Sequence, residues 1–223
     1  SEVSIRRSAK GGNINLTSNK ASGVGINVSN SGQLLALLDA AAPGPGGTIT
    51  ILATGASSQA NVQGTVQADR GTIDIRHTGA SGQVQVAGVN SDFPAYLHAD
   101  VVKVGALGNN GTLTVGDAFI DADTTIKLYA PGSNGELNFI ANASLSSGTS
   151  TILAANRVTI QPSVVVDIQG TGGPAQVYTN DPNYSGFGGS NPSNGTFTGN
   201  GAASPQPLAS APPFGPQPNH GHH

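Results

Sequence analysis

The sequence has little charge and no cysteine. Only 9% of its 223 residues are charged, and the formal net charge is −3. A chain this poor in Lys and Arg has no basic surface for nucleic acid, and it has no acidic run that would gather cations by bulk charge. Without cysteine, its fold depends on neither disulfides nor the redox compartment. We therefore expect partners to be recognised by shape and hydrogen bonding, with no nucleic acid and no cofactor.

Methionine is also absent, and the chain begins at Ser1. We interpret these two features as signs of processing, as in an extracellular or bacterial cell-surface protein that has lost its leader. The longest apolar run, LLALLDAAA from Leu34, is far shorter than the span that a bilayer requires. We therefore expect no membrane span.

A glycine followed by alternating polar and apolar residues recurs along most of the chain. Examples are GTITI from Gly47, GTIDI from Gly71, GTLTV from Gly111 and GELNF from Gly135. Alternation with a period of two places Ile49 and Ile51 on one face of a strand and Thr50 on the other. The pattern therefore predicts strands, each preceded by a turn at the glycine.

The spacing of these runs predicts how the strands are arranged. Gly47 and Gly71 lie 24 residues apart, as do Gly111 and Gly135. A repeat of this length without helical periodicity is typical of solenoids. We predict an all-β, single-stranded β-solenoid (a parallel β-helix) over residues 12–170, preceded by an N-terminal extension over residues 1–11. An antiparallel sandwich is the rival fold, because short alternating strands suit it too.

One segment near the N-terminus departs from the repeat. Leucines occupy positions 34, 35, 37 and 38, Asn30 or Ser31 can serve as N-cap, and prolines follow from Pro43. These features predict one short helix over about residues 31–42 that covers an end or a side of the rod.

The composition changes again at Thr171. Residues 171–223 are rich in proline and glycine, and we predict an extended tail there. Aromatic residues spaced along such a tail are typical of anchors that insert into grooves on a rigid surface. These aromatic residues are Tyr178, Tyr184, Phe187, Phe197 and Phe214.

Candidate chemistry is sparse. Asp117, Asp121 and Asp123 could act as acid and base on a polysaccharide or bind calcium, although a solvated, turn-rich edge explains them as well. The terminal His220, His222 and His223 are weak candidates for a transition-metal site.

One strand carries a charged pair. Asp74 and Arg76 share a strand face, where a cross-coil ion pair is the ordinary explanation, and His77 beside them has no evident nucleophile. We therefore expect structural roles for all three.

The coils GTITILATG and GTIDIRHTG resemble those of bacterial filamentous-haemagglutinin-like exoproteins of the two-partner-secretion type. This resemblance covers about residues 10–170, and the tail is similar to the carboxy-terminal end of such large surface proteins. It implies a right-handed β-solenoid, secretion, and a role in adhesion or surface structure, with no catalytic residues. The short chain fits a carboxy-terminal fragment released from a longer precursor.

These observations lead to one main hypothesis and two alternatives. The main one is a secreted, non-enzymatic structural subunit that assembles head to tail with copies of itself into an extracellular filament. An open solenoid edge and a tail with aromatic anchors favour a contact that repeats from copy to copy. The alternatives are an adhesin module that binds a glycan or host surface, and a polysaccharide lyase or hydrolase. The candidate polymer contacts are Ile5, Tyr178, Tyr184, Phe187, Phe197 and Phe214.

Overall fold

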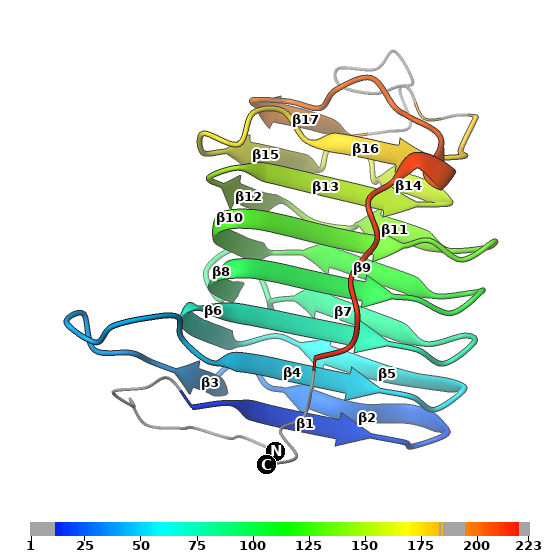
Figure 1. Ribbon diagram of the computed structural model, residues 1–223. Coiled ribbons are helices and arrows are strands. Elements are labelled where there is room, and N and C mark those ends of the chain that lie inside the picture. The colour runs from blue at the N-terminus through cyan, green and yellow to red at the C-terminus, as the bar shows by residue number, and fades with distance from the viewer. Residues whose placement is uncertain (1–11, 183, 185–194, 219–223) are drawn as a thin grey trace.

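The computed structural model describes residues 12–182, 184 and 195–218, and it is an all-β parallel solenoid. Successive coils stack along one axis, and each coil takes about two dozen residues (Figure 1). All pairings between the named strands are parallel, in an 11-stranded and a 6-stranded sheet. An antiparallel sandwich is therefore excluded, and the predicted β-solenoid is confirmed.

The coils build three faces, which we call A, B and C. The strands β6 (Thr65–His77), β8 (Ala95–Ala106) and β10 (Ala118–Ala130) each run from face A into face B through a bend. Face A is completed by β3 (Gln33–Ala36), β12 (Ala143–Ser147), β15 (Val165–Gln169) and β17 (Thr196–Gly199). Face B is completed by β1 (Ile14–Ser18), β4 (Thr48–Ala53), β13 (Ser150–Ala155) and β16 (Gln176–Thr179).

Face C is the separate 6-stranded sheet. Its strands are β2 (Ser22–Val28), β5 (Ser57–Val62), β7 (Gln83–Ala87), β9 (Thr112–Gly116), β11 (Glu136–Phe139) and β14 (Arg157–Ile160).

The core fills the inside of the solenoid with stacked aliphatic side chains. Ile49 pairs with Ile73, Ile73 with Val102, and Val102 with Ile126, and all four are fully buried. The alternation seen in the sequence produces this stack, because every second side chain of a strand points inward. Each such side chain contributes about 1.5–3 kcal/mol through burial.

The helix predicted over residues 31–42 does not form. Residues 33–36 form β3, and Leu34, Ala36 and Leu38 are buried in strand alternation. The leucine run satisfies both periodicities, and pairing with β6 gives the backbone of β3 partners in the sheet. Among the described residues, the one helical element is the 3-10 turn η1 (Leu208–Ser210), and no helix there is long and apolar enough to cross a membrane.

Parallel pairing continues past Gly170. β16 adds to β13 and β17 adds to β15, and Phe197 of β17 packs edge-on against Phe139 at 6.3 Å inside the core. The chain then follows the outer edge of β16, to which it is joined by bridges at Ala202 and Gln206. In Figure 1 the last described residues, in red, descend across β13, β10, β8 and β6 of face B.

Candidate functional site

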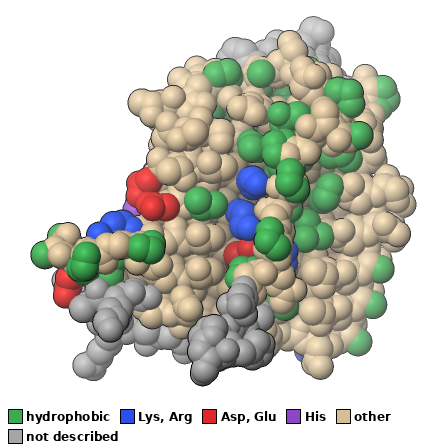
Figure 2. Space-filling view, in the orientation of Figure 1, with side chains coloured by type: hydrophobic (Ala, Val, Ile, Leu, Met, Phe, Trp, Pro, Cys, Tyr) green, Lys and Arg blue, Asp and Glu red, His purple; other side chains and the backbone are tan. Residues whose placement is uncertain are grey.

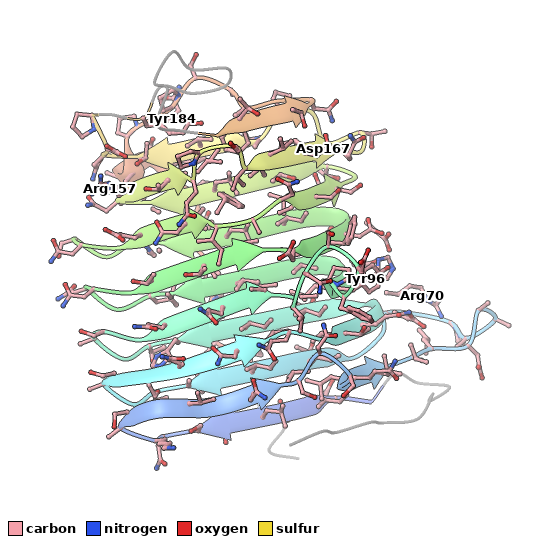
Figure 3. The ribbon with its side chains drawn as sticks, turned by 180° about the vertical axis from the view of Figure 1, so that it is seen from behind. Arg70, Tyr96, Arg157, Asp167 and Tyr184 are labelled. Atoms are coloured by element: carbon pink, nitrogen blue, oxygen red, sulfur yellow. The ribbon has the colours of Figure 1, made fainter. Side chains whose placement is uncertain are left out.

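The outer side of face A carries a row of side chains from successive coils. Tyr96 pairs with Phe119, Phe119 with Ser144, and Ser144 with Asp167. Parallel, in-register pairing places the same strand position of each coil above the last, so these side chains stand one above another. Figure 3 shows Tyr96 and Asp167 on the same side of the solenoid. We call these four residues the aromatic row, after Tyr96 and Phe119.

Phe119 is the most exposed member of this row, with 49% of its surface accessible to water. Beside it the surface is hollowed over about 250 Å³. The lining combines an apolar floor with carboxylate, amide and hydroxyl groups, as ligand sites usually do. It includes Pro94, Asp117, Phe119, Asn142, Ser144 and Asp167.

An exposed loop stands next to the hollow. Residues 88–94 lie between β7 and β8, and Val89 and Phe93 are 61% and 59% exposed. Hydrogen bonds from the amides of Val89 and Phe93 to the carbonyls of Phe93 and Asn90 close the loop on itself. Ser91 and Pro94 of this loop line the hollow, so the loop forms part of its wall.

A second row lies beside the aromatic row. His98 Nδ1 is 3.1 Å from an Asp121 carboxylate oxygen, and the imidazole stacks on the Tyr96 ring with 6.2 Å between centroids. Burial raises the pKa of Tyr96, and the negative charges of Asp121, Asp123 and Asp69 raise it further. The phenol is therefore neutral at physiological pH and can donate a hydrogen bond.

A pair of carboxyl groups ends these strands of face A. Burial raises the pKa of Asp100, and a hydrogen bond with Asp123 and that residue's charge raise it further, while the charges of His98 and Arg70 act in the opposite direction. Arg70 follows the equivalent strand position one coil earlier and has a left-handed backbone, with φ of 49°.

The three coils share a short repeat that the strand alternation alone does not reveal. Residues 65–69, 96–100 and 119–123 read TVQAD, YLHAD and FIDAD, and each ends in the Ala-Asp pair that closes its face A strand. An alignment of the coils therefore predicts that Tyr96, His98 and Asp100 lie beside Asp121 and Asp123. The alternation within each single segment does not predict this proximity.

The predicted acidic residues separate into two places. Asp121 and Asp123 lie beside His98 and Asp100, whereas Asp117 has φ of 44° and lines the hollow at the other end of the strand. Within residues 12–182, 184 and 195–218, no three His, Cys, Asp or Glu side chains are arranged to hold a metal ion. His220, His222 and His223 lie outside the described residues.

The aromatic residues of the tail make contacts within the chain. Phe197 is buried in the core, and Phe214 is buried on face B. Tyr178 packs against the cluster that Phe214 forms with Tyr129, Ile152 and Ala154. Tyr184 packs partly buried against the core, and burial raises its pKa. Contacts of these residues with a second copy stay a prediction. Ile5 and Phe187 lie outside the described residues.

Asp74 on face B pairs with Arg76 of its own strand, and the cross-coil ion pair predicted for this face forms with Lys103. Arg76 Nη2 lies 2.6 Å from Asp74, and Lys103 from the next coil lies 3.2 Å from the same carboxylate. His77 is fully buried with Nε2 2.9 Å from the Ser58 hydroxyl, so this pair is closed to any substrate.

The fold defines a parallel β-solenoid, consistent with a β-helix protein. Comparison with known proteins found no matching family model, no matching curated protein and no matching solved structure. The likeness to filamentous-haemagglutinin-like exoproteins therefore stays a prediction.

Proposed function

We propose that this chain is an extracellular β-solenoid module that binds a neutral polysaccharide across the outer side of face A. The observation that carries the proposal is the aromatic row, with its hollow, beside a second row of hydrogen-bonding side chains on the same face. This function corresponds to the adhesin alternative.

The chemistry of the face suits a sugar polymer. The C–H face of a pyranose ring packs on aromatic rings such as Phe119 and Tyr96, and its hydroxyl groups donate to carboxylates such as Asp121 and Asp167. Because the rows run along the solenoid axis, successive sugar units can contact successive coils. A surface that repeats along the solenoid axis therefore matches a polymer of repeating sugar units.

The charge of the face favours a neutral ligand. Asp100, Asp117, Asp121, Asp123 and Asp167 all lie on or beside it. A polysaccharide with carboxylate or sulfate groups would be repelled by these side chains. We therefore expect neutral hexose or acetylated hexosamine polymers to bind better than acidic ones.

Hydrolysis of a polysaccharide stays a prediction. Its candidate carboxylates lie in two places, because Asp121 is beside His98 with Asp123 close by, whereas Asp117 lines the hollow at the other end of the strand. This separation favours binding as the first function to test.

Assembly into a filament stays a prediction. The described part of the tail contacts its own chain, and the bridges at Ala202 and Gln206 cover the outer edge of β16. These contacts lower the support for stacking through that edge, and they favour carbohydrate binding as the first function to test.

The test is a binding screen against immobilised neutral and acidic polysaccharides, followed by titration calorimetry with the best oligosaccharide. We expect Tyr96→Ala and Phe119→Ala each to weaken binding at least tenfold, because each removes a ring from the row. Val24→Ala is the matched control, since Val24 is 45% exposed on face C. Binding unaffected by both aromatic substitutions, or binding of acidic polymers alone, would contradict the proposal.

A further inference from the structure

The outer side of face B holds a groove that is filled by the C-terminal segment, residues 207–218. Lys103 and Lys127 stand in one row of adjacent coils, and Arg76, Gly105 and Tyr129 stand in the next. Figure 2 shows Lys and Arg side chains in blue beside this segment near the middle of the view. We call these five residues the face B groove.

The groove holds the backbone of the segment through its carbonyl oxygens. Tyr129 Oη donates to the Pro212 carbonyl at 2.7 Å, and Lys127 Nζ donates to the Pro213 carbonyl at 2.7 Å. Arg76 donates to the carbonyls of Gly215 and Pro216 at 3.3 and 3.0 Å. Burial lowers the pKa of Lys127, and the nearby Lys103 charge lowers it further. The hydrogen bond to the Pro213 carbonyl gives the Lys127 ammonium an acceptor in this partly buried position.

Phe214 anchors the segment. Its ring packs on Tyr129 at 5.4 Å between centroids, and the Arg76 guanidinium and the Lys103 ammonium lie over it at 4.8 and 5.3 Å. The ring occupies the space left by Gly105, where a Cβ would lie 2.9 Å from it. The absence of a side chain at position 105 therefore creates the pocket for this ring.

These contacts are those of peptide recognition. From Pro212 to Pro216 the groove offers side-chain donors to carbonyls and an aromatic surface, and no strand pairing fixes this stretch to the sheet. Proline-rich segments are recognised in this way, because their preformed extended shape loses little entropy on docking.

We propose that the face B groove is a binding site for the sequence Pro-Pro-Phe-Gly-Pro, and that it accepts this segment from a second copy of the chain. None of the contacts depends on the covalent connection between groove and segment. In the intact chain the connection gives the segment a high effective concentration at its own groove, so docking within one copy dominates. Copies become linked when the segment of one finds an empty groove on another.

The proposal is tested by complementation in the full-length chain. Phe214→Ala removes the anchor and leaves the groove intact, while Gly105→Val blocks the pocket and leaves the segment intact. The atoms nearest to the valine Cβ would be the ends of the Leu107 and Phe214 side chains, and valine suits a strand, so we expect the coil to tolerate it. Each variant alone should sediment as a monomer, and an equimolar mixture should form a one-to-one heterodimer in sedimentation velocity.

Two matched controls keep the groove filled by its own segment. Phe93→Ala removes an exposed ring elsewhere, and Thr114→Val adds a valine to an outward position of face C. Neither Phe93→Ala mixed with Gly105→Val nor Thr114→Val mixed with Phe214→Ala should associate.

A labelled peptide of residues 207–218 gives a second measurement. It should bind full-length Phe214→Ala at least tenfold more tightly than wild type, whose groove is occupied, and should not bind Gly105→Val. A monomeric mixture together with no binding of the peptide to Phe214→Ala would overturn the proposal and leave the segment a contact within one copy only.

Discussion

The His77 imidazole is held neutral by its surroundings. Its Nδ1 accepts a hydrogen bond from the Gly79 amide at 3.0 Å, so Nε2 carries the proton that faces the Ser58 hydroxyl. Burial lowers the pKa of His77 below its ordinary value of 6.5, and hydrogen bonding with Ser58 offsets this in part. A second proton on the ring would remove the acceptor that fixes this turn.

This arrangement predicts that stability falls in acid. The unfolded chain takes up a proton on His77 at a higher pH than the folded chain does, so the free energy of unfolding is fully retained above pH 6.5 and decreases below it. Urea unfolding between pH 7.5 and pH 5 measures this slope. His77→Gln should flatten the slope, and a slope equal to that of wild type would show that other groups cause it.

At the scale of the elements, glycines stack from coil to coil in the turn between faces B and C. Gly79, Gly108 and Gly132 occupy the same turn in successive coils, and a Cβ on each would collide with the backbone of the glycine one coil earlier. A Cβ on Gly108 would lie 2.0 Å from the Gly79 carbonyl oxygen. These close approaches explain why glycine punctuates the repeat.

Gly108→Ala should therefore destabilise the solenoid by about 1–3 kcal/mol, because the backbone it meets cannot move as a side-chain end can. Denaturant unfolding monitored by circular dichroism measures the change. Gly12→Ala is the control, since nothing lies within 4 Å of a Cβ there. Equal midpoints for Gly108→Ala and wild type would contradict the glycine stacking as a packing constraint.

The elements differ in how far the sequence could predict them. Strict alternation in GTITI and GTIDI identifies β4 and the face B half of β6, because one inward face is a strong constraint. The leucines near Leu34 satisfy helix and strand periodicity alike, and only the partner strand β6 decides between them. Local pattern therefore fails where a neighbouring coil provides the deciding contacts.

The candidate sites follow the same rule. The Ala-Asp repeat that joins Asp100 to Asp123 is present in the sequence and becomes visible once the coils are aligned. For the C-terminal segment, Phe214 in a proline-rich tail predicts an anchor. The face that receives it has no such signal, because Arg76 meets the Pro216 carbonyl, a group that every residue carries. Only the path of the folded chain brings these groups together.

At the scale of the whole molecule, the solenoid keeps its core and its two proposed sites on separate faces. The aliphatic stack fills the interior, face A presents the aromatic row, and face B holds the C-terminal segment. The proposed ligand on face A would contact the strands β8 and β10, which also carry the C-terminal segment on face B beyond a bend. The two proposed sites are therefore separable by measurement, although they share strands.

Hydrogen–deuterium exchange with and without a saturating neutral oligosaccharide tests the central proposal most directly. We predict slower exchange at the ligand-bound face A segments, residues 95–100 and 118–124, with no change in the face B segments, residues 72–77 and 125–130. Protection confined to face B, or spread evenly over all faces, would contradict the assignment of face A as the carbohydrate-binding surface.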